Sequence, residues 1–168
     1  MEVKRRFNFK HKLGKGAFGN VFLAEDLQQK RTVAIKVIRL ERCKGRIEDF
    51  QREVGVLATV QSPYITQYYG SYVVKSRIWL VMEFVGGGSV GDVIKTQHAL
   101  PEEAVAVILH YCLEALVYLH SHDQPHRDIK PANMLLTQTG ECKLCDLGIA
   151  GELTKAKGRK SKQRNCKC

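Results

Sequence analysis

Hydrophobic residues in the first part of the chain come in short runs separated by turn residues. Residues 7–13, 20–25 and 32–38 are rich in Val, Phe and Ile, which favour strands. After a Ser-Pro-Tyr break, residues 67–74 and 77–84 have the same character. The pattern predicts about five strands. An antiparallel meander is the simplest arrangement of the first three.

A segment with the hydrophobic spacing of a helix separates the two groups of predicted strands. One face of this predicted helix carries, at i, i+3, i+4 and i+7, the residues Phe50, Glu53, Val54 and Leu57. Because an isolated carboxylate is very costly to bury, Glu53 needs a cation. Lys36, which we place at the end of the strand V-A-I-K, is the nearest well-placed candidate. A solvated lysine at a strand end is the alternative.

Helices and loops follow the strands. The glycines at 86–88 end the sheet, and residues 90–96 form a short helix. Pro101 opens a longer helix whose apolar face holds Val105, Ile108, Leu109, Cys112, Leu116 and Leu119. After His120, short strands are expected in M-L-L-T and E-C-K-L-C. The chain is therefore predicted to have an α+β fold.

The net charge of +10 is concentrated near one end of the 168 residues. Residues 151–168 carry seven Lys and Arg against Glu152, whereas residues 1–150 carry 20 basic and 16 acidic side chains. No nucleic-acid reading element accompanies this charge, so we expect a solvated, disordered tail rather than a nucleic-acid site. The apolar runs are too short for a membrane span and the start lacks an apolar signal core. We therefore expect a cytoplasmic location, no membrane partner and reduced cysteines.

The segment G-K-G-A-F-G-N-V contains the glycine-rich spacing of phosphate-binding loops. Gly14, Gly16 and Gly19 join two predicted strands, whereas dinucleotide-binding glycines open a helix. Glycine lets the backbone approach phosphates closely. A phosphate-covering hairpin is favoured, and an ordinary glycine hairpin is the alternative.

The segment H-R-D-I-K-P-A-N holds three residues suited to group transfer. Asp128, Lys130 and Asn133 suit a general base, a phosphate contact and a metal ligand. Asp146, in C-D-L-G, follows a predicted strand. Its carboxylate and the Asn133 amide are the oxygen donors that Mg²⁺ prefers. Cys142 and Cys145 form a C-x-x-C pair, which could in principle bind zinc. They lie, however, in the segment already predicted to be the strand before Asp146.

The glycine loop, V-A-I-K, the helix glutamate, H-R-D-x-K-x-x-N and D-x-G occur in the order found in eukaryotic serine/threonine protein kinases, which the chain resembles. The segments S-P-Y-I-T-Q-Y-Y-G-S-Y, M-E-F-V-G-G-G-S-V-G-D and A-G-E-L-T resemble the germinal-centre (sterile-twenty-like) group. The resemblance implies a protein-kinase-like fold: a five-stranded antiparallel small lobe with one helix, then a truncated, mainly helical large lobe. It also implies transfer of the ATP γ-phosphate to protein Ser/Thr hydroxyls, with Mg²⁺.

The resemblance assigns roles to individual residues. Asp128 would orient the substrate hydroxyl and accept its proton, with Lys130 near the γ-phosphate, and Asn133 and Asp146 would hold Mg²⁺. Met82 would be the gatekeeper before a hinge that pairs with adenine. The implied ATP-binding residues are Leu13, Gly14, Lys15, Gly16, Ala17, Phe18, Gly19, Val21, Ala34, Lys36, Glu53, Met82, Glu83 and Val85.

The chain departs from the kinase pattern in three places. Leu147 replaces the usual phenylalanine, Pro125 precedes the catalytic-loop histidine, and only 20 residues follow Gly148. We therefore expect a partial kinase domain over 1–151, divided into 1–85 and 86–151, followed by the tail 152–168. Part of the apolar face of the helix after Pro101 should then be exposed. The alternative function is a catalytically impaired nucleotide-binding or regulatory module that contacts a regulatory or adaptor protein.

Overall fold

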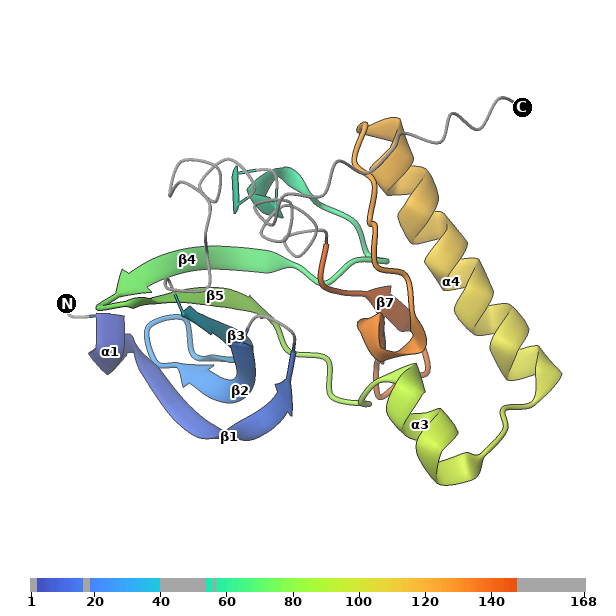
Figure 1. Ribbon diagram of the computed structural model, residues 1–168, viewed down its shortest axis with the longest axis horizontal. Coiled ribbons are helices and arrows are strands. Elements are labelled where there is room, and N and C mark those ends of the chain that lie inside the picture. Colours follow the sequence, from blue (N-terminus) through green and yellow to red (C-terminus); the bar gives the residue numbers. More distant parts are fainter. Residues whose placement is uncertain (1–2, 17–18, 40–53, 56, 148–168) are drawn as a thin grey trace, which may run out of the picture.

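The computed structural model describes residues 3–16, 19–39, 54–55 and 57–147 (Figure 1). Its main sheet is antiparallel, with five strands in the order β1-β2-β3-β5-β4. The strands are β1 (Phe7–Lys15), β2 (Gly19–Asp26), β3 (Arg31–Arg39), β4 (Tyr68–Val74) and β5 (Arg77–Glu83). The predicted strands and the meander of β1 to β3 are confirmed. The later hairpin joins this meander through β5, which leaves β4 at the edge.

The two faces of β3 support two separate hydrophobic clusters. Val33 and Ile35 pack with Phe7, Ala24 and Val81 on one face. Ile38 lies on the other face with Ile78, Leu80 and Leu57. Because side chains alternate along a strand, Lys36 shares the face of Ile38 rather than that of Ile35. The strand β3 is therefore apolar on both faces around Lys36.

The predicted position of Lys36 at a strand end is wrong. The strand continues to Arg39, and Lys36 lies opposite Val21 of β2 and Leu80 of β5. Its exposed fraction is 4%. The apolar residues Val37 and Ile38 extend the strand beyond the V-A-I-K motif and bury the lysine. Residues 54–55 and 57–59 are helical, as predicted, whereas Phe50 and Glu53 lie outside the described residues.

A second, mainly helical part follows β5. It contains α3 (Val90–Gln97), α4 (Glu102–Ser121), the 3-10 helix η2 (Pro131–Asn133), β6 (Met134–Leu136) and β7 (Cys142–Leu144). Ser89 caps α3 by accepting a hydrogen bond from the Asp92 amide. Ile108, Ala115 and Leu119 of α4 pack with Met134 and Leu144 of the β6–β7 hairpin. Figure 1 shows this hairpin between the sheet and α4.

One short segment connects the sheet to the helical part. The Leu144 amide donates to the Tyr64 carbonyl at 2.8 Å, and the Thr66 amide donates to the Leu144 carbonyl at 3.0 Å. The Gln61 amide donates to the Tyr118 hydroxyl of α4 at 2.8 Å. Residues 61–66 therefore hold the β6–β7 hairpin and α4 beside the start of β4.

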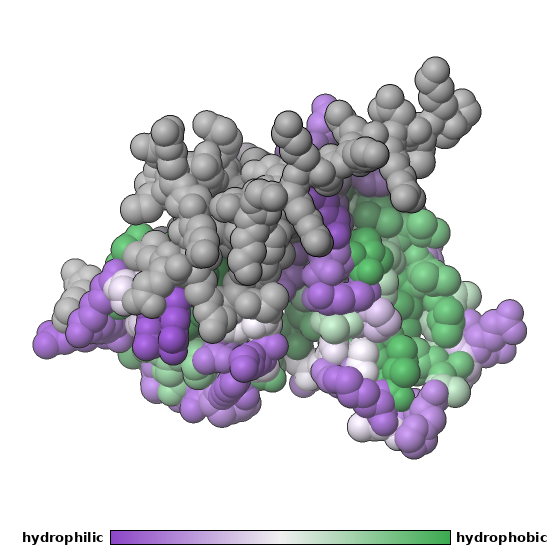
Figure 2. Space-filling model, in the orientation of Figure 1, coloured by the Kyte–Doolittle hydropathy of each residue, from purple (hydrophilic) through white to green (hydrophobic). Residues whose placement is uncertain are grey.

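One side of α4 is apolar and open to solvent. Its exposed residues Val105, Leu109, Leu113 and Val117 recur every four positions. Figure 2 shows hydrophobic residues gathered over α4. This agrees with the expected exposure of part of the apolar face, on which Val105 and Leu109 are exposed whereas Ile108 is buried. Because α4 carries apolar residues on both its buried and its exposed side, the pattern of apolar and polar residues does not show which side faces the core.

The apolar character of α4 also bears on the predicted absence of a membrane span. By length and composition alone, Glu102–Ser121 could cross a membrane, which the sequence reading did not anticipate. One such helix is weak evidence, because core helices meet the same criterion. Here Ile108, Cys112 and Leu119 pack against the β6–β7 hairpin. These packed residues are a minority, because 22% of the span is buried.

A buried carboxylate fixes the start of the chain to the sheet. Asp26 is fully buried and accepts two hydrogen bonds from the Arg6 guanidinium, at 2.9 and 2.7 Å. The amides of Gln28 and Gln29 also donate to Asp26, and Arg6 donates to the Tyr72 hydroxyl at 2.7 Å. The Arg6 hydrogen bonds, above all, hold the pKa of Asp26 below its usual range. One ion pair thus joins α1 (Val3–Arg6), the β2–β3 turn and β4.

Asp26→Ala should lower the free energy of unfolding by about 2–4 kcal/mol, because Arg6 and two backbone amides would lose their acceptor. Urea unfolding followed by circular dichroism would measure the loss. Glu25→Ala is the matched control, since the Glu25 side chain is 45% exposed and its ion-pair partner Lys10 is 46% exposed. It should change the stability by less than about 0.5 kcal/mol. Equal losses in the two variants would contradict the role of Asp26.

Candidate active site

The glycine-rich segment forms the β1–β2 hairpin. The Gly16 amide donates to the Gly19 carbonyl at 2.9 Å across the turn. A β-carbon at Gly19 would lie 1.9 Å from the Val37 carbonyl oxygen, so the backbone of β3 excludes any larger residue there. Ala17 and Phe18 lie outside the described residues. The hairpin therefore joins two strands, as predicted, and Gly19 has a steric requirement of its own.

Lys36 connects the sheet with the segment after β7. Its Nζ donates to Asp146 Oδ1 at 2.5 Å, and the side chains of Lys36 and Asp146 are 5% and 34% exposed. The expected partner Glu53 lies outside the described residues, so that pairing remains a prediction. Asp146 has a positive φ of 62°, which is uncommon for residues other than glycine and recurs at functional sites. The buried ammonium thus has an anionic partner from the other half of the molecule.

The loop before β6 gathers three predicted residues. Lys130 Nζ donates to Asp128 Oδ2 at 2.6 Å, and Asn133 Nδ2 donates to the same oxygen at 3.0 Å. Asn133 also donates to the Asp128 carbonyl oxygen at 2.8 Å and is buried. The Lys130 hydrogen bond is the main cause that lowers the pKa of Asp128. Asp128 is therefore an ionised carboxylate held in a fixed position.

His126, for which the sequence predicts no role, joins this loop to the Asp146 segment. It is 2% exposed, and its Nε2 lies 2.9 Å from the Cys145 carbonyl oxygen. A carbonyl oxygen only accepts, so Nε2 carries the hydrogen and Nδ1 accepts from the Asp128 amide at 3.3 Å. Burial lowers the pKa of His126 and favours this neutral form. The Cys145 amide also donates to the Asn133 carbonyl at 2.9 Å.

Several apolar residues of the sheet lie on the strands that lead to the hinge after β5. Ala34 of β3 is the cross-strand partner of Met82, and Ala34 and Val85 are both 8% exposed. Val21 lies opposite Lys36 on β2. Leu13 of β1 is 42% exposed. All five belong to the predicted ATP-binding residues, and Val21 and Ala34 lie on the strands next to and containing Lys36.

Sequence reasoning missed Leu135 in the same region. Met134 and Leu136 on β6 pack into the core cluster with α4. Because side chains alternate, Leu135 faces the opposite side of the hairpin, together with its cross-strand partner Lys143. Lys143 contacts Glu83 at the end of β5. Leu135 therefore lies on the hairpin face turned toward the hinge, a placement that depends on the strand register.

The hinge residue Glu83 refines the predicted adenine contacts. Its amide donates to the Gln67 carbonyl at 2.8 Å. The Glu83 N–H group is therefore already used within the sheet. Of its two backbone polar groups, only the carbonyl could pair with adenine, and hydrogen-bond donation must come from further along the predicted hinge Glu83 to Val85.

The predicted metal ligands fit a magnesium ion that is shared with a nucleotide. Asn133 uses its Nδ2 on Asp128, which leaves its side-chain oxygen as a donor for a cation, and Asp146 contributes a carboxylate. Over the part of the chain that the structure describes, no group of three or more His, Cys, Asp and Glu residues gathers. Mg²⁺ commonly takes one or two protein oxygens and completes its shell with phosphates and water.

The cysteines near the site suit core packing rather than zinc binding. Burial raises the pKa of Cys142 to about 11 and is the main cause that raises the pKa of Cys145 to about 12. Zinc requires thiolates, which these environments disfavour. Cys142 lies in the core with Cys112.

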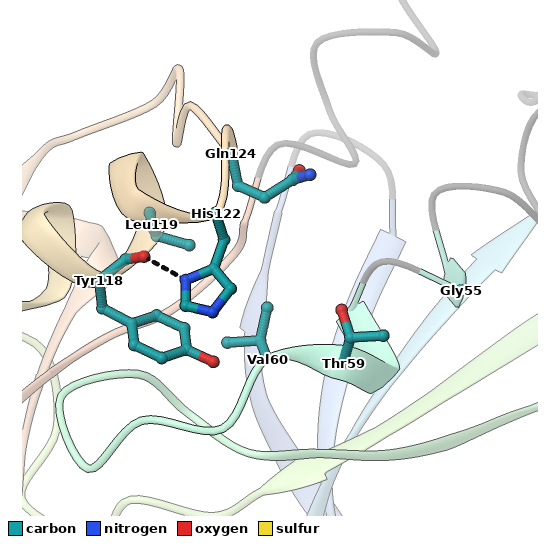
Figure 3. A pocket seen from close by; sticks show the side chains of 7 residues that line it. All are labelled: Gly55, Thr59, Val60, Tyr118, Leu119, His122 and Gln124. Carbon is teal, nitrogen blue, oxygen red and sulfur yellow. Dashed lines mark hydrogen bonds between the residues drawn. The ribbon is translucent and has the colours of Figure 1, made fainter.

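A separate pocket of about 360 Å³ lies between the helical segment that ends near Thr59 and the end of α4 (Figure 3). His122 at its edge has Nδ1 2.8 Å from the Tyr118 carbonyl oxygen and stacks on the Tyr118 ring. The lining residues are Gly55, Thr59, Val60, Tyr118, Leu119, His122 and Gln124. None of them is a predicted site residue.

Comparison with known proteins identifies the family. Residues 7–166 match the protein kinase domain. The chain belongs to the protein kinase family. Over 84% of its length it is 42% identical to the serine/threonine-protein kinase ppk11 of Schizosaccharomyces pombe, of which it covers 45%. It is 41% identical over 93% of its length to serine/threonine-protein kinase 1 of Arabidopsis thaliana and 40% identical over 88% to serine/threonine-protein kinase hippo of Drosophila melanogaster.

These similarities confirm the predicted resemblance to serine/threonine kinases of the germinal-centre group and the predicted protein-kinase-like fold. The chain spans less than half the length of these relatives: 45% of the first, 19% of the second and 22% of the third. The kinase activity of these longer relatives is therefore a proposal for this chain. Protein kinases as a family use ATP and Mg²⁺.

The burial of His126 predicts a pH dependence of stability. Its folded-state pKa lies below the ordinary 6.5, so the unfolded chain binds more protons and stability falls as the pH decreases below about 6.5. His126→Gln cannot titrate and should flatten this part of the profile. The measurement is urea unfolding between pH 7.5 and 5.5.

His11→Gln serves as the control for His126→Gln, because His11 is exposed on β1. It should leave the pH profile of stability as in the unmodified chain. A profile that His126→Gln does not change would contradict the neutral, buried histidine.

Proposed function

We propose that this chain binds Mg-ATP and transfers the γ-phosphate to Ser or Thr hydroxyls of proteins. The observation that carries the proposal is the meeting of charged residues from three separate segments. Lys36 from β3 pairs with Asp146 after β7, and Asp128 with Lys130 lies in the loop that His126 joins to the Asp146 segment. This juxtaposition concentrates cations for phosphates, oxygen donors for magnesium and a carboxylate for the hydroxyl in one region.

Nucleotide binding would use both halves of the molecule. The β1–β2 hairpin with Gly14, Gly16 and Gly19 would cover the phosphates, and Lys36 would contact the α- and β-phosphates. Adenine would lie among Ala34, Val21, Met82 and Val85 of the first part of the chain, and Leu135 of β6 would contact it from the other part. The Glu83 carbonyl would accept a hydrogen bond from the base. Asn133 and Asp146 would hold Mg²⁺, which offsets the phosphate charge when it is bound.

The transfer step needs an oriented nucleophile and charge stabilisation. The Ser or Thr hydroxyl oxygen would attack the γ-phosphorus, the bond from the γ-phosphorus to the oxygen of the ADP leaving group would break, and the hydroxyl proton would pass to Asp128. Asp128 suits this role because Lys130 and Asn133 fix its carboxylate in the ionised form. Lys130, on the same carboxylate, would contact the transferring phosphoryl group.

A protein bearing a Ser or Thr hydroxyl is the proposed substrate, and the cytoplasm the proposed location. The names of the relatives support the substrate class, since all three are serine/threonine-protein kinases. A regulatory or adaptor protein is a further proposed partner.

The second candidate function is a nucleotide-binding or regulatory module without transfer activity. The exposed apolar stripe of α4, which includes Leu113 and Val117 at 59% and 65% exposure, favours it. Such a face can bind another protein without using Asp128. Nucleotide binding without phosphoryl transfer by the unmodified chain would support this second candidate over the first.

Asp128→Asn should lower phosphoryl transfer from ATP by about 10²–10⁴-fold, because the amide cannot accept the hydroxyl proton. Transfer of radiolabelled γ-phosphate to a generic basic protein would measure the loss. Mg-ADP binding, followed by calorimetry, should remain within about twofold. Asp123→Asn is the matched control, since Asp123 is exposed beyond the end of α4. Retained transfer in Asp128→Asn would contradict the proposed role.

A further inference from the structure

The side chain of Glu83 links three segments of the chain. Its Oε1 accepts from Lys143 Nζ at 2.6 Å, and its Oε2 accepts from the Gln67 amide at 3.0 Å. The Glu83 amide donates in return to the Gln67 carbonyl at 2.8 Å. We call Gln67, Glu83 and Lys143 the hinge strap. One carboxylate thus ties the end of β5 both to the segment before β4 and to β7.

Lys143 lies close in the chain to the proposed magnesium ligands. It is the central residue of β7, three positions before Asp146, and its cross-strand partner on β6 is Leu135. Asn133 immediately precedes β6. The β6–β7 hairpin therefore carries both proposed magnesium ligands at its base, and Lys143 is its side-chain attachment to the hinge.

Backbone hydrogen bonds reinforce the strap on its other side. Leu144 exchanges hydrogen bonds with the Tyr64 carbonyl and the Thr66 amide, at 2.8 and 3.0 Å. Leu144 itself points into the core and is 1% exposed. Lys143 and Leu144 therefore anchor opposite faces of the same strand, one to the hinge and one to residues 64–66. Rotation of the hairpin relative to the sheet would break both attachments.

The Lys143–Glu83 ion pair is less exposed than an ordinary surface pair. The side chains of Lys143 and Glu83 are 19% and 24% exposed, compared with 75% and 67% for the surface pair of Lys95 and Asp92. The strap borders an open pocket of about 390 Å³ that is also lined by Gln61, Ser62, Pro63 and Tyr69. Partial burial reduces screening, and the Gln67 amide satisfies the second carboxylate oxygen.

From this geometry we propose that Glu83 is a positioning residue: through Lys143 and Gln67 it fixes the orientation of the β6–β7 hairpin relative to the sheet. The strap thereby sets the separation between Lys36 on the sheet and the Asn133 and Asp146 ligands, and limits the opening through which nucleotide leaves. The nucleotide part of this inference rests on the proposed function, whereas the attachment of the hairpin does not.

The test compares Glu83→Gln, Lys143→Met and the double variant in the full chain. Gln keeps an acceptor for the Gln67 amide but loses the charge, and the substitution leaves the hinge backbone unchanged. Amide hydrogen exchange in peptides covering 64–69, 80–84 and 142–146 should be about fivefold faster in each single variant. The double variant should exchange no faster than the singles, because both remove the same ion pair.

A second readout is the dissociation rate of fluorescently labelled Mg-ADP, measured by stopped flow. It should rise by about the same factor in each single variant, with no further rise in the double variant. Lys10→Met is the matched control, since it removes a cross-strand ion pair with Glu25 within the sheet. It should change neither the exchange at the strap nor the dissociation rate.

The outcomes separate the strap from the proposed function. Unchanged exchange in the strap peptides, or faster exchange spread equally over β1 and β2, would overturn the inference. Local exchange as expected with a dissociation rate like that of the unmodified chain would show that the strap does not control the site, and would also overturn it. If the unmodified chain binds no nucleotide, the proposed function fails, and the expected local exchange would still support the strap's attachment of the hairpin.

Discussion

The structure depends on a buried positive charge. Lys36 lies in the middle of β3 with apolar neighbours on both adjacent strands and is 4% exposed. A buried ammonium requires an anion, and among the described residues Lys36 pairs with Asp146, which follows β7 in the other half of the molecule. The sheet and the helical part are therefore joined through the same groups that are proposed to meet phosphates and magnesium.

Hydrogen bonds around this pair limit how the two halves can move. The residue before Asp146 is Cys145, whose carbonyl contacts His126 and whose amide donates to the Asn133 carbonyl. Behind the hinge, Glu83 holds Lys143 of the same hairpin. The groups proposed to act on ATP are thus fixed mainly through the β6–β7 hairpin. A kinase site assembled this way gains positional accuracy from backbone contacts, which matters because phosphoryl transfer relies on positioning and charge.

Sequence periodicity predicted most of the sheet and the long helix α4, because elements buried on at least one face leave a strong apolar signal. It could not place Lys36 within its strand, since V-A-I-K continues into further apolar residues. The roles of His126, Leu135 and the Glu83 side chain were also missed. Each depends on strand register or on contacts between residues far apart in the chain, as with Glu83 and Lys143, which are 60 positions apart. The family motifs identified the proposed site residues but not these supporting contacts.

The most direct test of the central claim is the effect of Mg²⁺ on ATP affinity, measured by calorimetry for the unmodified chain and for Asp146→Ala. If Asp146 holds magnesium beside phosphates that Lys36 contacts, Mg²⁺ should raise the affinity of the unmodified chain. The same addition should have little effect on the variant, which should still bind metal-free ATP. An equal Mg²⁺ effect in both proteins, or no ATP binding by the unmodified chain, would contradict a shared nucleotide and metal site at the junction of the two halves.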